Sequence, residues 1–186
     1  MPIEIRRAAA NDLCAVSALL GETWHATYDG IYGVDRVSDI TARWHSAEVL
    51  VKGVGKSDEA FLVAVEGARI LGTLSIGIAC GGGLKLDRLY VHPQAQGRGL
   101  GRRLLDAGLG AFGPSKVTLE VEPANAQAIR FYERNGFVVT GKTSDCGCSG
   151  DGIAALVMTR DAGASAKPAA ALAKSAVSSE GMASKR

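Results

Sequence analysis

The stretch that decides the fold lies at residues 91–101 and has the sequence Val-His-Pro-Gln-Ala-Gln-Gly-Arg-Gly-Leu-Gly. An apolar strand pattern at residues 84–91 leads into it, and a helical pattern at residues 99–109 follows. Closely spaced glycines let backbone N–H groups approach a ligand without a Cβ in the way. The first turn of a helix adds unpaired N–H donors and a partial positive charge. The stretch therefore predicts a pyrophosphate cradle between a strand and a helix.

Two common nucleotide-binding loops and a plain turn compete with this interpretation. A Walker loop would end in Gly-Lys-Ser/Thr, whereas Gly101 is followed by Arg102 and Arg103. The dinucleotide fingerprint needs Gly-x-Gly-x-x-Gly, and residues 97–101 lack that spacing. A glycine-rich turn without a ligand stays open on this stretch alone.

The apolar residues before the loop change phase within one strand pattern. Leu84 and Leu86 share one parity, whereas Leu89 and Val91 share the other. One extra residue near Asp87, a β-bulge, would restore a single apolar face and bend the strand away from its neighbour. A strand buried on both faces is the alternative.

Length and composition favour one domain with a short appendage. The chain has 186 residues, of which 47% are hydrophobic, enough for a core. We expect residues 1–161 to form the domain. Residues 162–186 are rich in Ala, Ser and Lys with almost no large apolar side chain, so this tail is predicted to be disordered.

Charge and cysteine content argue against several classes of partner. A formal net charge of +2 without a long basic block disfavours nucleic acid. No run of about 18 apolar residues occurs, and the N-terminus lacks a signal-peptide core, so no membrane association and a cytoplasmic location are expected. The four cysteines are then predicted to be free thiols. Because the Cys146–Cys148 spacing is too short for a zinc pair, no metal is predicted.

Periodicity along the chain predicts alternating strands and helices. Strand patterns occupy residues 3–7, 61–65, 70–79, 84–91, 116–122, 137–142 and 153–159. Helical patterns occupy residues 11–20, 38–49, 99–109 and 125–135, whereas residues 24–32 predict a loop or a short helix. The last two strand patterns are expected to pair.

Two sequence blocks resemble the signatures of one protein family. Residues 96–101, Gln-Gly-Arg-Gly-Leu-Gly, match the Gln/Arg-x-x-Gly-x-Gly/Ala loop of the GCN5-related N-acetyltransferase (GNAT) superfamily. Residues 89–93 resemble the strand end that feeds this loop, and residues 119–137 resemble the second signature. The resemblance implies an α/β GNAT (acyl-CoA N-acyltransferase) fold. That fold has a central mixed, mostly antiparallel sheet with splayed parallel strands and with helices on both faces.

The resemblance also implies that an acetyl group moves from acetyl-CoA to a primary amine by direct attack through a tetrahedral intermediate. An amine with a pKa of about 10.4 must lose a proton first, which costs roughly 4 to 5 kcal/mol at pH 7. The protein would therefore need a base, donors for the oxyanion, and an acid for the departing thiolate.

Tyr132 is the candidate acid, because a phenol and a thiol have similar pKa values. Asn125 lies seven residues earlier, within about 20° on a helix, and Ala128 lies near the same face. In the family, the matching asparagine binds the pantetheine arm and the matching tyrosine meets the sulfur. The oxyanion donor would be a backbone N–H around Tyr90 or Val91. A Tyr132 with a packed ring and a solvated hydroxyl is the alternative.

Acetyl-CoA is expected to be held by the strand end, the loop and the two helices that follow. The candidate residues are Leu89, Tyr90, Val91, Gln96, Gly97, Arg98, Gly99, Leu100, Gly101, Arg102, Asn125, Ala128 and Tyr132. Arg102 and Arg103 cannot both face the ligand, because helix neighbours differ by about 100°.

The base and the acceptor site are less determined by sequence. Glu120 and Glu122 share one strand face and are candidate catalytic bases, as is Asp87 at the expected bulge, although each also fits a solvated carboxylate. Trp24, Tyr28 and Asp87 are candidate substrate-binding residues, with core packing as the alternative for Trp24.

Three acceptor or ligand classes stay open. The loop and the long N-terminal half favour a small-molecule amine. Residues 119–137 also resemble the corresponding block in ribosomal-protein N-terminal acetyltransferases. A non-catalytic acyl-CoA-binding regulator on the same fold is the third. The resemblance is also compatible with a homodimer.

Overall fold

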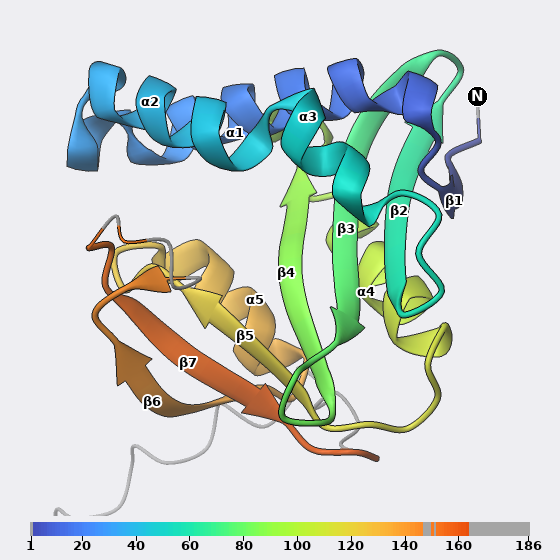
Figure 1. Ribbon diagram of the computed structural model, residues 1–186, viewed down its shortest axis with the longest axis vertical. Coiled ribbons are helices and arrows are strands. Elements are labelled where there is room, and N and C mark those ends of the chain that lie inside the picture. Colours follow the sequence, from blue (N-terminus) through green and yellow to red (C-terminus); the bar gives the residue numbers. More distant parts are fainter. Residues whose placement is uncertain (1, 147–149, 151, 164–186) are drawn as a thin grey trace, which may run out of the picture.

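The computed structural model describes residues 2–146, 150 and 152–163 (Figure 1). These residues form a seven-stranded sheet in the order β1-β2-β3-β4-β5-β7-β6. Neighbouring strands are antiparallel except for the parallel pair β4 and β5. The strands are β1 (Glu4–Arg7), β2 (Glu59–Glu66), β3 (Arg69–Ile78), β4 (Leu84–Val91), β5 (Val117–Val121), β6 (Val138–Thr143) and β7 (Ala155–Arg160). The mixed, mostly antiparallel sheet is therefore confirmed.

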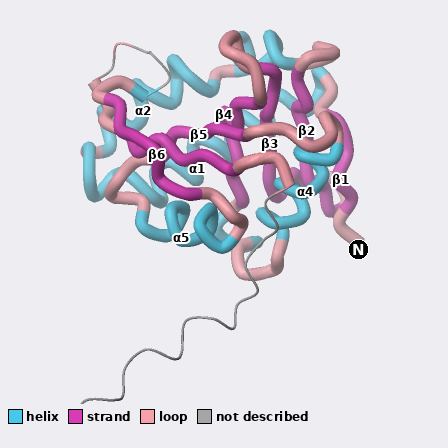
Figure 2. The backbone as a smooth tube through the Cα atoms, turned by 90° about the horizontal axis from the view of Figure 1, so that it is seen from below, coloured by secondary structure: helices cyan, strands magenta, loops and turns pink. Residues whose placement is uncertain are grey.

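Helices cover both faces of the sheet, as the resemblance implies (Figures 1 and 2). The first face carries α1 (Leu13–Tyr32), α2 (Val34–His45) and α3 (Ala47–Leu50), and the second carries α4 (Leu100–Gly110) and α5 (Ala126–Arg134). Alternation along β2 explains this division, since successive strand side chains point to opposite faces. Phe61 and Val63 pack with α1, whereas Leu62 packs with α4.

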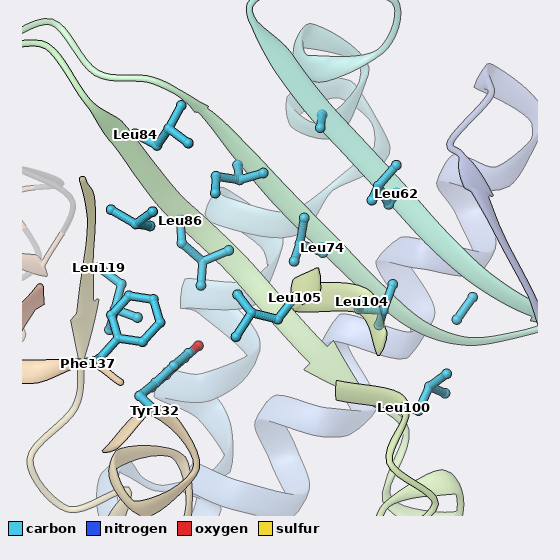
Figure 3. Close-up of a cluster of buried hydrophobic side chains, with 14 of the residues drawn as sticks. Leu62, Leu74, Leu84, Leu86, Leu100, Leu104, Leu105, Leu119, Tyr132 and Phe137 are labelled. Atoms are coloured by element: carbon cyan, nitrogen blue, oxygen red, sulfur yellow. The ribbon is translucent and has the colours of Figure 1, made fainter. Parts of the chain in front are cut away.

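The α4 face holds the larger hydrophobic core (Figure 3). Leu100, Leu104 and Leu105 of α4 are fully buried against β2, β3 and β4. A Cβ on Gly108 would lie 2.6 Å from the end of the Leu74 side chain, so the helix packs closely on β3 and a larger residue there would force Leu74 to shift. This packing fixes the N-terminus of α4 at the end of β4.

The interpretation of residues 24–32 as a loop or a short helix is corrected by the structure. They form the second half of α1, which continues to Tyr32. Trp24 and Tyr28 lie four residues apart and are 5% and 7% exposed. Burying two aromatic side chains outweighs the roughly 1 kcal/mol cost of a helical glycine such as Gly30. Helix α1 ends at Gly33, whose φ is 83°, and α2 starts at Val34 rather than at residue 38.

The bulge predicted in β4 is present at Asp87. Ser75 of β3 pairs with Arg88, and the next residue, Ile76, pairs with Leu86, so Asp87 is the extra residue. The parallel pairing of β4 with β5 ends at Leu86. Beyond that point the two strands separate toward their C-terminal ends (Figure 1). The bulge thus bends β4 and opens the sheet, as bulges do.

The remaining predictions concern the C-terminal part. The last two strands pair antiparallel, as expected. Residues 164–186, most of the predicted disordered tail, and residues 147–149, which include Cys148, lie outside the described residues. Among the helices that the structure describes, none has the length and apolarity needed to cross a membrane.

Candidate functional site

A cavity of about 930 Å³ lies where β4 and β5 separate. It reaches from the N-terminus of α4 and one side of α5 to α1 and α2 on the other face of the sheet. The sequence-predicted residues that line it are Trp24, Tyr28, Asp87, Leu89, Tyr90, Val91, Gln96, Gly97, Gly99, Leu100, Gly101, Arg102, Glu120, Glu122, Asn125, Ala128 and Tyr132. Arg98 is the exception, and its guanidinium pairs with Glu66 at 3.0 Å. The structure therefore brings the expected donor and acceptor residues into one space.

The glycine-rich loop has the backbone that an anion cradle requires. Gly97 and Gly99 have φ values of 75° and 73°, a region that residues with a Cβ rarely adopt. Gly99 is the N-cap of α4, and within the described part of the chain no side-chain hydrogen bond caps the start of the helix. Gly101, in the first turn of α4, faces Phe131 of α5, where a Cβ would lie 3.4 Å from the ring. Open N–H groups at a helix start fit a phosphate group.

Gln96 and the arginines occupy distinct places around this loop. Gln96 donates to the Val91 carbonyl at 3.2 Å and accepts from Gln127 at 3.1 Å, so it ties the loop to β4 and α5. Arg103 donates to the Ile3 carbonyl at 2.8 Å, whereas Arg102 lines the cavity and pairs with Asp106 at 2.7 Å. As expected, the neighbouring arginines do not both face the cavity.

Backbone N–H groups of β4 point into the gap between the strands. His92 donates its N–H to Leu71 of β3 at 2.9 Å. N–H directions alternate along an antiparallel strand, so Tyr90 also turns its N–H toward β3. Leu89 and Val91 turn theirs the other way, toward the side where β5 has departed. Of the two predicted oxyanion donors, Val91 has the suitable direction.

Tyr132 places its hydroxyl at the centre of the cavity wall. The side chain is 9% exposed and its ring packs against Phe131 and Phe137. The hydroxyl points from α5 toward β4 (Figure 3) and makes no hydrogen bond with a described residue. Burial raises the pKa of Tyr132 above that of an ordinary phenol, so the group stays protonated at neutral pH.

Asn125 differs from the expectation that it is part of the helix. It is the N-cap of α5, and its Oδ1 accepts from the Ala128 N–H at 3.0 Å. Its Nδ2 donates to the Tyr28 hydroxyl at 3.1 Å. Asn125 therefore joins α5 to α1 across the cavity, and the shared helical face with Tyr132 is replaced by this capping geometry.

The three candidate carboxylates line the cavity in different environments. Glu122 accepts from the Tyr32 hydroxyl and from the Ala124 N–H. Glu120 lies 3.6 Å from the Lys85 ammonium group. Asp87 has no ion-pair partner within 4 Å among the described residues. Burial within the cavity raises its pKa, which brings the carboxylate closer to the range of a useful general base.

Aromatic side chains form the wall opposite α5. Trp24 donates from Nε1 to the Tyr90 hydroxyl at 3.1 Å and also packs against Tyr28 and Trp44. Trp24 is thus both a core residue and a cavity residue. His45 lies within this wall, is 4% exposed, and neither ring nitrogen has a partner among the described residues. Burial, and secondarily Arg88, lower the pKa of His45 to about 3, so it is neutral.

Sequence reasoning missed several cavity residues, namely Trp44, His45, Lys52 and Arg88. They come from three segments, the end of α2, the turn after α3 and β4, and no local motif marks them. Within the described residues, no group of three or more His, Cys, Asp or Glu side chains is placed to hold a metal ion. Cys148, one half of the short cysteine pair, lies outside those residues.

Comparisons with known proteins agree with this geometry. Residues 57–139 match the model of the acetyltransferase (GNAT) domain family. The spermidine N(1)-acetyltransferase of Thermoplasma acidophilum is 29% identical over 146 residues, which cover 75% of this chain and 90% of that protein. The peptidyl-lysine N-acetyltransferase YjaB of Salmonella typhimurium is 36% identical over 61 residues, or 33% of this chain and 41% of that protein.

A solved structure extends the likeness to the whole fold. The PaiA N-acetyltransferase of Thermoplasma acidophilum, solved in complex with coenzyme A, superposes with a TM-score of 0.72 at 26% identity. The match covers 87% of this chain and 99% of that one. The open helix start at Gly99 and the parted strands at Leu86 are the features that the fold needs for this ligand. The chain belongs to the GNAT family and is an acetyl-CoA-dependent N-acetyltransferase.

Proposed function

We propose that this N-acetyltransferase acetylates the primary amine of a small molecule by direct attack on the acetyl group. The observation that carries the proposal is the opening of the sheet at Asp87. It exposes the Val91 N–H, the Tyr132 hydroxyl and three carboxylates to one cavity. A donor, an acid and a base are the groups that acyl transfer to an amine requires.

The end of the cavity at the start of α4, which we call the donor end, would hold acetyl-CoA through backbone groups. The N–H groups after Gly97 and Gly99 would bind the pyrophosphate, and Arg102 would add a charge-assisted contact. Leu89, Val91 and Ala128 supply an apolar passage between β4 and α5 for the pantetheine arm. When bound, acetyl-CoA supplies the thioester that is attacked.

The chain's own groups would then handle charge and protons. The Val91 N–H, which points away from β3 into the gap between the strands, would donate to the developing oxyanion. Tyr132 would donate its proton to the departing thiolate, and its raised pKa keeps that proton available. Asp87 would accept the amine proton directly or through water, and Glu120 on β5 and Glu122 just after it line the same cavity.

Cys146 also lines the cavity, and a cysteine thiolate would be a competing nucleophile. Burial raises the pKa of Cys146 to about 12, and the neighbouring Glu120 adds to this effect. The thiol is therefore neutral at physiological pH. This supports direct attack by the amine rather than an acyl-cysteine route.

The end of the cavity beneath α1 and α2, which we call the acceptor end, has a shape that supports a small-molecule amine as the acceptor. Helices α1 and α2 cross over this end (Figure 1), and Trp44 and His45, at the end of α2, line it. The relatives named above acetylate spermidine and peptidyl lysine, according to their names, so primary amines are the common acceptor group. A folded protein acceptor would have to pass this cover, whereas a small amine fits beneath it.

The test combines acetyl-CoA binding with an amine screen. Acetyl-CoA at 100 times its Kd should raise native stability by about 2.7 kcal/mol and increase the Tm accordingly. Release of free thiol from acetyl-CoA in the presence of small primary amines should identify turnover. A Tm shift without turnover on any amine would refute catalysis and favour an acyl-CoA-binding regulator.

A matched pair of glycine variants localises the donor end. Gly99→Ala and Gly113→Ala both introduce a Cβ at a positive φ, 73° and 71°, with no heavy atom within 4 Å. Both should lose similar stability from backbone strain, on the order of 1 kcal/mol. Gly99→Ala alone should weaken acetyl-CoA binding, because Gly113 lies beyond the other end of α4. Equal affinity in the two variants would count against the cradle.

A further inference from the structure

Charged side chains of both signs line the cavity. Four of its cations are Arg43 near the end of α2, Lys52 in the turn after α3, Lys56, and Arg88 on β4; we call these four the cationic wall. Three of its carboxylates are Asp87 on β4, Glu120 on β5 and Glu122 just after β5, which we call the acidic wall. The lining also holds two charges that are already paired, Glu59 beside Lys56 and Lys85 beside Glu120. A cavity built only for an amine or a polyamine needs no further unpaired cation.

Strand β4 contributes charges of both signs to this lining. The cavity extends through the gap between the parted strands, so consecutive β4 residues, from Lys85 to Val91, line it. Asp87, the extra residue of the bulge, and its neighbour Arg88 therefore place an anionic and a cationic group next to each other in the lining.

Two cations of this wall lack a counterion within the described part of the chain. Lys56 lies 3.8 Å from Glu59, and Arg43 pairs with Asp39 at 3.0 Å. Arg88 and Lys52 have no ion pair with a described residue, and Arg88 is half-buried. A partly desolvated guanidinium without a partner is unfavourable until an anion binds it. Its planar donors match a carboxylate or a phosphate.

His45 lies beside this set of cations without neutralising it. It lines the same cavity, is 4% exposed, and both of its ring nitrogens are enclosed without a hydrogen-bond partner among the described residues. Burial, and secondarily Arg88, lower the pKa of His45, so the imidazole is neutral and offers Arg88 no counterion.

We propose that the acceptor amine also carries an oxyanion, a carboxylate or a phosphate, which Arg88 and Lys52 bind while the amine lies against the acidic wall. The inference rests on the proposed function, since it assigns the substrate class of the same cavity. The cationic wall would attract such an acceptor and repel a polycation such as spermidine.

The experiment compares matched amines on the full-length chain by thiol release from acetyl-CoA. Phosphoethanolamine is paired with ethanolamine, and 3-aminopropanoate with propylamine; spermidine is the polycation. Each oxyanion amine should exceed its neutral partner in kcat/KM by at least about tenfold. The pair with the larger ratio identifies the oxyanion as a phosphate or a carboxylate.

Variants separate the cationic wall from general effects. Arg88→Gln should raise KM for the oxyanion amines about ten- to a hundredfold more than it raises KM for their neutral partners, and this ratio is the readout because Arg88 also acts on the neighbouring Asp87. Lys52→Gln, at an exposed position, should raise the KM for the oxyanion amines severalfold and provides a second test. Arg69→Gln, an exposed arginine outside the cavity, is the control and should change neither constant.

The outcomes are distinguishable. Neutral amines or spermidine used at least as well as the oxyanion amines would overturn the inference and leave the proposed function standing. An unchanged KM for the oxyanion amines in both Arg88→Gln and Lys52→Gln would also overturn the inference and leave the proposed function standing. If no amine is acetylated although acetyl-CoA raises the Tm, the proposed function fails and the inference fails with it.

Discussion

Replacing Tyr132 by Phe removes one hydroxyl from the cavity and leaves the ring in place. The hydroxyl makes no hydrogen bond with a described residue, so its loss breaks no interaction of the native state. The ring keeps its contacts with Phe131 and Phe137, at centroid distances of 5.3 Å and 5.5 Å. The free energy of unfolding should therefore stay within about 0.5 kcal/mol of the original value.

Turnover should respond differently. A positioned general acid contributes about 10²- to 10⁴-fold, and a hundredfold fall in kcat corresponds to about 2.7 kcal/mol of lost transition-state stabilisation. We expect the lower end of this range. Burial raises the pKa of the phenol, so proton transfer to a thiolate is uphill and the acid is less efficient than one matched to the leaving group.

The assay follows thiol release at saturating acetyl-CoA, with single-turnover measurements to show that chemistry limits the rate. Acetyl-CoA affinity and the Tm are measured on the same preparation, and both should stay near the original values. A kcat within twofold of the original protein, with chemistry rate-limiting, would remove Tyr132 from the mechanism. A parallel loss of the Tm would instead indicate a structural role.

Two further predictions concern stability. Leu105→Ala should lower the free energy of unfolding by about 2 to 5 kcal/mol, because Leu105 is fully buried beneath the sheet. The control, Ile78→Ala at a position that is 61% exposed, should change it by less than about 0.5 kcal/mol. Equal denaturation midpoints of the two variants would contradict the core assignment. Asp12 accepts two hydrogen bonds from Arg6, at 2.6 Å and 2.9 Å, which hold its pKa below the ordinary value. The stability from this pair is present above the unfolded pKa of about 3.9 and is lost as the pH falls through the lower folded pKa. Asp12→Asn should therefore flatten the stability curve in that acidic range, and an unchanged pH dependence of the midpoint would show that the pair contributes nothing.

The β4 bulge illustrates what short-range pattern can predict. Apolar residues must face the core on a strand, so the change of phase between Leu86 and Leu89 required an extra residue, and the structure places it at Asp87. The start of α4 was predicted for a similar reason. Glycines at positive φ and a following helical period are local features of residues 97–109.

The second half of α1 and the cap at Asn125 show where local pattern fails. Gly30 and the aromatic residues around it predict a loop or a short helix, but burial of Trp24 and Tyr28 under α2 and against β4 stabilises helix there. Asn125 fits a helical face by spacing alone. Its side chain instead caps α5 and contacts Tyr28, a partner 97 residues away.

By itself, the sequence predicted the strand, loop and helix of the donor end. These elements are consecutive, and their backbone geometry depends on neighbours in the chain, so residues 84–109 indicate a pyrophosphate cradle before any packing is known. The acyl-CoA ligand followed from the family resemblance of residues 96–101 and 119–137. Tertiary structure alone decided the acceptor end. His45, Lys52 and Arg88 come from separate segments, and their burial, charge balance and missing partners exist only after the helices pack over the parted strands. Charge and hydrogen bonding act through space, so the chemistry of the acceptor could not be determined from the order of residues.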